Sequence, residues 1–274
     1  MKIVVLMENR TQRPELRCAH GLSLYIETAT KKLLLDMGPD AGFVENAKTL
    51  GVDLAAVDMA FLSHGHDDHA GGLAAFCEVN DHAKIYMEKD AFGQYYDVTG
   101  GERLYAGVDP DFLRYRDRFV FTNGRTQVTP EITLFSDVRG DLYHIPMNDG
   151  MMELRRGVLV QDDFRHEQNL IVAEGEKRVL FTGCAHRGIV NILRRAEEIL
   201  GRSPDAVVGG FHLYNPITGE LPEEHIVQDI AGELSSRGLR CCTGHCTGIA
   251  GHRALHNAMG ERCGYLFCGK TVEI

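Results

Sequence analysis

The chain has 274 residues, of which 44% are hydrophobic and 25% are charged, as is ordinary for a soluble globular protein. Its net charge of −10 comes from 39 acidic and 29 basic residues without a basic stripe, which argues against nucleic acid as a partner. No apolar run approaches the ~18–20 residues that span a bilayer, and the N-terminus lacks the apolar region of a signal peptide. We therefore expect a cytoplasmic protein without a membrane partner.

The N-terminal part predicts short strands with tight connections. Apolar runs and apolar–polar alternation predict strands at residues 3–7, 22–27, 32–36, 58–62 and 84–88. Helical spacing predicts helices at 43–50, before Gly51, and at 71–77. Two later stretches, 91–117 and 139–163, show no clean period, and we interpret them as irregular excursions from the core that set substrate choice.

The C-terminal part alternates strands with helices. The predicted strands are 119–122, 131–136, 170–173, 178–181, 206–208 and 239–242. The predicted helices are 189–200 and 223–237, each followed by glycine. Such alternation is typical of a layered α/β protein, and the absence of an internal repeat or a linker favours a single domain over residues 1–274.

Histidines follow four of the predicted strands, each in a short loop that contains glycine or serine. They are His64, His186, His212 and His245. Functional sites of layered α/β proteins collect beyond strand ends, so we expect these side chains to converge. The first loop is the densest, because His64 and His66 flank Gly65 and Asp68-His69 follow. Imidazole and carboxylate suit zinc, and also iron or manganese.

Eight cysteines do not imply a disulfide framework in a chain of this length. Several lie toward the C-terminus, among them Cys246, and their loose spacing resembles a zinc ribbon only weakly. We interpret them as buried free thiols.

The histidine loop resembles the His-x-His-x-Asp-His signature of the metallo-β-lactamase superfamily. Further blocks resemble the branch named for a ribofuranosylaminobenzene-phosphate synthase of the methanopterin pathway. These blocks are His20–Leu24, Asp36–Gly38, Ser63–Leu73, Thr182–Asn191, Gly209–Leu213 and Thr243–Gly248. The resemblance implies a four-layer αββα sandwich with two divalent metal ions at one edge, zinc being favoured over iron or manganese.

The resemblance also assigns ligands to the two metals. The first metal is assigned to His64, His66 and His186. The second metal is assigned to Asp68, His69 and His245. Better-known members have a bridging aspartate where this chain has Cys184, so either Cys184 bridges as a thiolate or hydroxide alone bridges. Alternatively, His166 or Glu167 takes the third-ligand position and leaves His186 another role.

Other polar residues near these blocks have less defined roles. His212 is a ligand, a proton donor to the leaving group, or a residue that orients a ligand. Asp36 is expected to hold a ligand imidazole, and Asp67 to support the loop or face away from the metals. The remaining histidines lack the strand-end pattern, although His20 lies in one of the resembling blocks. They are His20, His82, His144, His225, His252 and His256.

These residues predict a hydrolase of a small molecule that uses a metal-activated hydroxide. Asp68 orients the nucleophile, and His212 or a bound water protonates the leaving group. We expect a phosphodiester or another phosphorylated substrate first, and a lactone or thioester second. The alternative to an enzyme is a metal-bearing protein that binds a pterin- or folate-like ligand without turnover. The sequence leaves the oligomeric state open.

Overall fold

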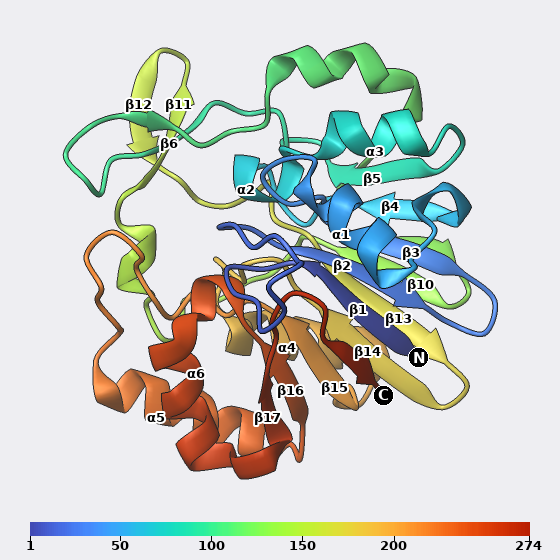
Figure 1. The fold of residues 1–274 in the computed structure, drawn as a ribbon. Coiled ribbons are helices and arrows are strands. Elements are labelled where there is room, and N and C mark those ends of the chain that lie inside the picture. Colours follow the sequence, from blue (N-terminus) through green and yellow to red (C-terminus); the bar gives the residue numbers. More distant parts are fainter.

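Two seven-stranded mixed sheets form the centre of the molecule in a computed structural model that describes residues 1–274 (Figure 1). In spatial order, the first sheet contains β18 (Thr271–Glu273), β1 (Lys2–Met7), β2 (Ser23–Glu27), β3 (Lys32–Leu35), β4 (Met59–Phe61), β5 (Lys84–Glu88) and β8 (Phe119–Thr122). The second contains β17 (Cys263–Tyr265), β16 (Arg240–Thr243), β15 (Ala206–Gly209), β14 (Lys177–Phe181), β13 (Asn169–Glu174), β10 (Ile132–Phe135) and β9 (Thr126–Thr129). Strands β3, β4, β5 and β8 are parallel in the first sheet, and β14 to β17 in the second.

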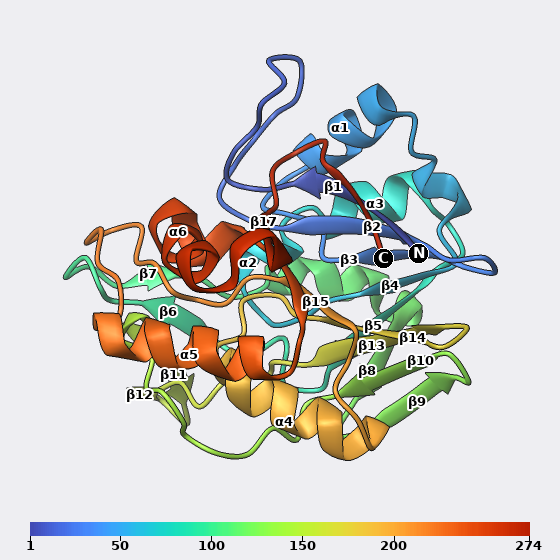
Figure 2. The ribbon, with the colours of Figure 1, turned by 90° about the horizontal axis from the view of Figure 1, so that it is seen from below.

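Helices cover the outer faces of both sheets (Figures 1 and 2). Beside the first sheet lie α1 (Gly42–Leu50), α2 (Asp67–Ala70) and α3 (Leu73–Val79). Beside the second lie α4 (Ile189–Leu200), α5 (Glu224–Ser236) and α6 (Gly248–Met259). Short 3-10 turns complete the helical elements: η1 (Leu54–Ala56), η2 (Pro110–Arg118), η3 (Pro146–Asn148), η4 (His245–Thr247) and η5 (Gly260–Arg262). The expected four-layer αββα sandwich is therefore confirmed.

Three buried clusters hold the layers together. A cluster of 19 residues lies between the two sheets, and clusters of 25 and 24 residues lie between each sheet and its helices. Successive side chains of a strand point to opposite faces, so Ile3 and Val5 of β1 enter the central cluster while Val4 and Leu6 face the helices. Burial on both faces explains why β1 is an unbroken apolar run.

A third, four-stranded sheet stands apart from the sandwich, at the upper left of Figure 1. It consists of β12 (Val158–Gln161), β11 (Met151–Arg155), β6 (Tyr95–Asp97) and β7 (Leu104–Tyr105). The sequence predicted that 91–117 and 139–163 are irregular, which is wrong: the two excursions pair through β6 and β11. Strands of two to five residues are too short to show a period, and the β6–β11 pairing joins two segments that lie far apart in the chain.

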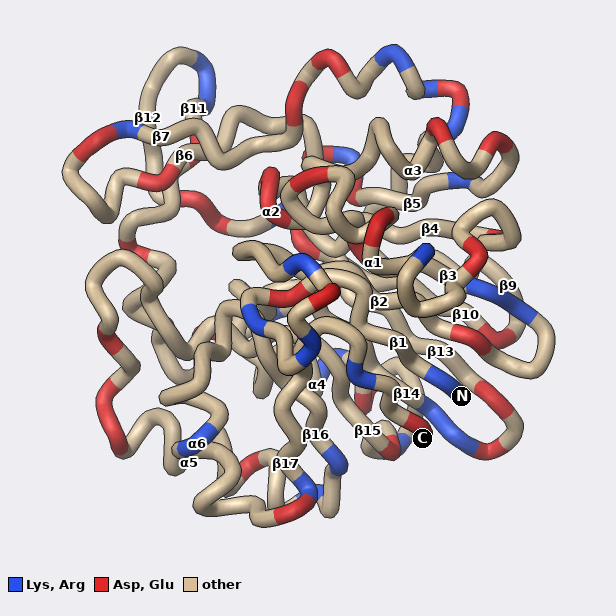
Figure 3. The backbone as a smooth tube through the Cα atoms, in the orientation of Figure 1, with Lys and Arg blue, Asp and Glu red and all other residues tan.

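Most other predicted elements are present, with shifted ends. The helix predicted at 71–77 begins at Leu73, because α2 occupies the preceding turn. Helix α6 was not predicted, nor were β9, β17 and β18. Lysine and arginine are scattered among acidic residues over the whole molecule (Figure 3). None of the helices combines the length and apolar character needed to cross a membrane.

Candidate metal centre

Loops at the carboxyl ends of four strands carry the histidines singled out by the sequence. One loop follows β4 of the first sheet, and the others follow β14, β15 and β16 of the second. Because both sheets present these strand ends at the same edge of the sandwich, the loops meet there. Gly183 allows the closest approach between them, since a Cβ at this position would collide with Ser63 Oγ of the opposite sheet.

A first group of candidate ligands contains His64, His66 and His186. Their ring centroids lie 4.6, 5.0 and 4.9 Å apart in the pairs His64–His66, His64–His186 and His66–His186. All three rings are buried, and the Nε2 atom of each has no hydrogen-bond partner. A buried polar atom without a partner is costly, so three of them together indicate a site that a metal ion fits.

Hydrogen bonds at Nδ1 fix the tautomers of two of these imidazoles. Ser63 Oγ donates to Asp36 Oδ2 at 2.7 Å and therefore accepts from His64 Nδ1 at 2.9 Å. His186 Nδ1 lies 2.9 Å from Asn148 Oδ1, whose amide nitrogen donates to the His186 carbonyl at 2.8 Å. In both rings Nδ1 carries the hydrogen, so the Nε2 lone pair is available to a cation.

The three imidazoles of the first group are neutral. Burial, with the neighbouring imidazoles adding to it, lowers the pKa of His64 and of His186 well below the usual range. The same causes lower the pKa of His66 to about 3. Metal ligation requires the unprotonated ring, so the first group is ready to bind an ion at neutral pH.

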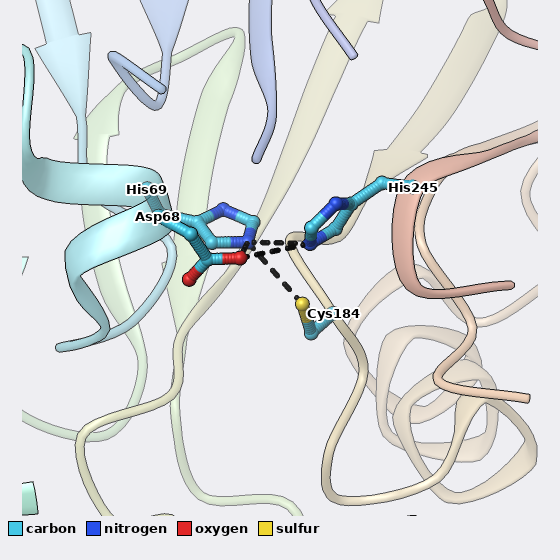
Figure 4. Close-up of side chains that lie close together, drawn as sticks. All are labelled: Asp68, His69, Cys184 and His245. Atoms are coloured by element: carbon cyan, nitrogen blue, oxygen red, sulfur yellow. Dashed lines mark hydrogen bonds and ion pairs between the residues drawn. The ribbon is translucent and has the colours of Figure 1, made fainter. Parts of the chain in front are cut away.

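A second group contains Asp68, His69, Cys184 and His245 (Figure 4). The Nε2 atoms of His69 and His245 face each other at 3.1 Å, and Asp68 Oδ2 lies 3.1 Å from His245 Nε2. The Nδ1 atoms of the two rings face oxygen acceptors, Asp36 Oδ2 at 2.7 Å and Asn9 Oδ1 at 2.8 Å. Two facing Nε2 lone pairs repel each other unless a positive charge lies with them, so this group also fits a metal ion.

The charges around His69 favour a cation at the second group. Burial lowers the pKa of His69, but the carboxylates of Asp68 and Asp36 outweigh it and raise that pKa to about 9. The two carboxylates that stabilise a proton on His69 also attract a metal ion to this group, because both the proton and the metal ion are positively charged.

Cys184 lies between the two groups. Its Sγ is 3.2 Å from His69 Nε2, and it also clusters with His64 and His186 within 4.8 Å. Burial raises the pKa of the thiol well above its usual range, so a nearby cation is needed to form the thiolate. The geometry thus suits a sulfur that faces both groups.

His166 and Glu167 are both engaged in other hydrogen bonds, although His166 also lies in a third group of possible ligands with His66 and Asp162. His166 Nδ1 accepts the Gly65 N–H at 2.9 Å, so Nε2 carries the hydrogen that faces Asp162 Oδ2 at 3.0 Å. The Glu167 oxygens accept backbone N–H groups of His186 at 2.6 Å and Arg187 at 3.0 Å. This geometry favours His186 over either residue as the third ligand of the first group.

Two buried carboxylates hold the ligand loops through backbone N–H groups, a role that the sequence analysis did not predict. Glu167 anchors the loop of His186, as described above. Glu8, at the end of β1, accepts the backbone N–H of His245 at 2.6 Å through Oε1 and that of Arg10 at 2.7 Å through Oε2. The only sign in the sequence was a glutamate directly after an apolar run, which does not show what Glu8 supports; its full burial is seen in the structure.

His212 stands beside the first group, with ring centroids 4.2 Å from His186. Both of its ring nitrogens lack hydrogen-bond partners, and its backbone N–H donates to Cys246 Sγ at 3.3 Å. His212, Cys184 and Cys246 together form a further group of possible ligands. Cys246 was predicted to be only a buried thiol; it is buried, and it also lies beside the centre.

Two further side chains of the sequence blocks lie near the centre. His20 Nε2 is 3.4 Å from Asp68 Oδ2, and Asp67 contributes to the cavity wall above the ligands. Burial raises the pKa of Asp67 to about 6. The other histidines set aside by the sequence analysis pair elsewhere. Their partners are Asp81 for His82, Asp149 for His144, Glu223 for His225, and the Cys263 carbonyl for His252 and His256.

A cavity of about 250 Å³ opens above both groups of ligands. Its floor includes Asp68, Cys184 and His245, and its walls come from the third sheet and from the segment after β15. Residues of both groups of ligands therefore line this cavity.

An αββα sandwich with clustered imidazole, carboxylate and thiol groups at one sheet edge defines a class of metal-binding proteins. The chain belongs to the metallo-beta-lactamase superfamily, whose family model matches residues 16–197.

Two similar proteins and one further solved structure align with nearly the whole chain. A protein of Methanocaldococcus jannaschii named 7,8-dihydropterin-6-methyl-4-(beta-D-ribofuranosyl)-aminobenzene-5'-phosphate synthase is 28% identical over 269 residues, 93% of this chain and 90% of the relative. The crystal structure of Tm1679, described as a metal-dependent hydrolase of the beta-lactamase superfamily, has 27% identity and a TM-score of 0.81, covering 100% and 99% of the two chains. Zn²⁺-bound PqqB from Methylobacterium extorquens shares the fold at 13% identity and a TM-score of 0.58, covering 100% of both chains. The expected superfamily and branch are confirmed.

Proposed function

We propose that the chain is a hydrolase that holds two divalent ions, preferably zinc, and cleaves a phosphodiester of a small molecule. Such ions polarise a phosphoryl oxygen and lower the pKa of a water molecule toward about 7. Iron and manganese are the alternatives, because imidazole and carboxylate also suit them. We also propose that the protein is cytoplasmic and that it binds neither nucleic acid nor a membrane.

One observation carries the proposal: five buried imidazoles and a buried thiol converge with the Asp68 carboxylate below an open cavity. The imidazoles are those of His64, His66, His69, His186 and His245. Burying so many polar groups is unfavourable unless a ligand pairs with them. Two groups that meet at Cys184 support two neighbouring ions rather than one.

Two residues at the cavity have the right properties for proton transfer and positioning. Asp68 is 17% exposed in its side chain and is thus the carboxylate that can orient an attacking water. His212 lines the same cavity with both ring nitrogens unpartnered, so it can hold the proton that the leaving group needs.

The relatives support this proposal from two directions. The description of Tm1679 favours hydrolysis, and the name of the archaeal relative favours a phosphorylated, pterin-like compound. A lactone or thioester is the second choice of bond. The alternative to an enzyme is a protein that binds a pterin- or folate-like ligand without turnover. Activity measurements distinguish this binding protein from a hydrolase.

Replacing Asp68 tests the proposed hydrolase. We expect Asp68→Ala to lower kcat toward bis(p-nitrophenyl) phosphate about 100-fold or more, because a residue that orients the nucleophile is lost. The control is Asp81→Ala, which removes a carboxylate whose side chain is 100% exposed and should leave kcat unchanged. Full metal content without turnover of phosphodiester, phosphomonoester, lactone and thioester probes would contradict the proposal.

A further inference from the structure

The cavity above the candidate metal centre contains no lysine or arginine among its 20 lining residues. Nine of these residues are hydrophobic, and Asp67, Asp68 and Asp97 supply carboxylates. Bound metal ions would therefore be the main positive charges available to an anion in this cavity. A second anionic group on the substrate would face Asp97 without a partner.

One wall of the cavity is an aromatic surface from the third sheet. Leu104 and Tyr105 of β7 are 52% and 43% exposed. The Tyr105 ring is fixed, because its hydroxyl donates to the Val108 carbonyl at 2.9 Å and the ring packs edge-on against Tyr96 at 5.4 Å. The nearby Arg103 lies over Tyr96 at 3.9 Å and does not line the cavity.

The opposite wall comes from the segment between β15 and α5. Tyr214 lines the cavity, and Ile217, which is 52% exposed, extends the wall at its mouth. Asn215 fixes this segment, since its Oδ1 accepts the N–H groups of Ile217 at 2.9 Å and Thr218 at 3.1 Å. Both apolar walls are thus held in place by hydrogen bonds before any ligand binds.

We infer that the substrate carries an aromatic group, neutral or cationic, that lies between Tyr105 and Ile217 while its phosphoryl group faces the metal centre. This inference rests on the proposed function and specifies its substrate class. Aromatic rings prefer edge or offset contacts with other rings, which the fixed Tyr105 offers. Asp97, at the end of β6, selects for a cationic substituent and against an anionic one.

Binding of unreactive phosphonates to the zinc-loaded protein tests the inference without turnover. By calorimetry, we expect phenylphosphonate to bind about tenfold tighter than methylphosphonate. Tyr105→Ala and Ile217→Ala should remove most of this preference by weakening the binding of phenylphosphonate more than that of methylphosphonate. The matched controls are Phe121→Ala and Val158→Ala, since these residues are 48% and 61% exposed and do not line the cavity.

A second pair of phosphonates tests the preference for a cationic substituent. We expect 4-(aminomethyl)phenylphosphonate to bind tighter than 4-carboxyphenylphosphonate, and Asp97→Asn to reduce the difference about tenfold. Equal binding of phenyl- and methylphosphonate, or tightest binding of the carboxylate, would overturn the inference. So would sedimentation that shows a dimer lost in Tyr105→Ala, since a second chain would then cover the walls.

The outcomes separate this inference from the proposed function. If bis(p-nitrophenyl) phosphate is hydrolysed but the phosphonates do not differ in affinity, only the aromatic subsite is wrong. If phenylphosphonate binds preferentially but no ester is hydrolysed, the subsite stands and the hydrolase proposal fails.

Discussion

Asp36 connects the two groups of candidate ligands through a single buried carboxylate. Its Oδ2 accepts from Ser63 Oγ and faces His69 Nδ1, each at 2.7 Å, and its Oδ1 accepts the Ser63 N–H at 2.7 Å. Because Ser63 in turn holds His64, Asp36 orients one imidazole of each group. Such supporting residues raise the basicity of a ligand and fix its ring.

Replacing this carboxylate should weaken both groups at once. We expect Asp36→Asn to lower the affinity for zinc about 10- to 100-fold, measured by competition with a chelator. Asparagine tolerates the positive φ of 60° at this position, so the change tests the charge and not the backbone. An affinity equal to that of the exposed control Asp81→Asn would show that Asp36 does not support the ligands.

Strand-end positions predicted that the loops of His64, His186, His212 and His245 converge, as they do, but not that Cys246 lies beside them. Strand-end positions were also not sufficient for Glu8 and Glu167, which act through backbone N–H groups. Glu8 supports His245 across 237 positions of sequence. A contact of that separation leaves no periodic or local pattern, so only the folded chain reveals it.

At the scale of elements, the third sheet is hydrogen-bonded directly to the histidine loop. The N–H of Asp67 donates to the Ala106 carbonyl at 2.9 Å, beside β7. His166 joins Asp162, next to β12, to the Gly65 N–H. Hydrogen bonds therefore connect the third-sheet wall of the cavity to the histidine loop beneath it.

Two histidine variants should separate a supporting role from ligation. We expect His166→Leu to keep the full number of metal ions per chain and to lower the free energy of unfolding by about 2–4 kcal/mol, because Gly65 and Asp162 lose their partner. His186→Leu should lose metal, which elemental analysis measures. A loss of one ion in His166→Leu, with none lost in His186→Leu, would reverse the two roles.

Helix α6 escaped prediction for a physical reason. Helix α6 buries Gly248, Gly251, Leu255 and Met259, so half of its inward stripe carries no side chain and shows no apolar period. Gly251 relieves crowding there, since a Cβ would lie 3.0 Å from Leu213 Cβ. Most sandwich strands, by contrast, are apolar runs that are buried on one or both faces. The unpredicted β9, β17 and β18 are edge strands of three or four residues, too short to show a pattern.

For the whole molecule, the candidate centre joins the two halves of the sandwich. The loop of His64 to His69 belongs to the first sheet, and those of Cys184, His186 and His245 belong to the second. Metal binding should therefore stabilise the packing of the sheets against each other.

Metal removal should lower the thermal stability by a measurable amount. When the free metal concentration is a hundredfold above Kd, binding raises the free energy of unfolding by about 2.7 kcal/mol for each site. This difference corresponds to several degrees in Tm. Calorimetry with and without a chelator measures this difference. The Asp68→Ala protein, with one ligand fewer, should show a smaller difference, and an unchanged Tm after complete metal removal would contradict the assignment.

The long separation between Glu8 and His245 also has a consequence for the order of assembly. Bringing together residues 237 positions apart costs entropy that local contacts do not, so we expect this contact to form after much of the two sheets has formed. His245 would then reach its place in the second group late in folding. We therefore expect the complete second group only in a nearly folded chain, whereas the local loop of His64 to His69 can form earlier.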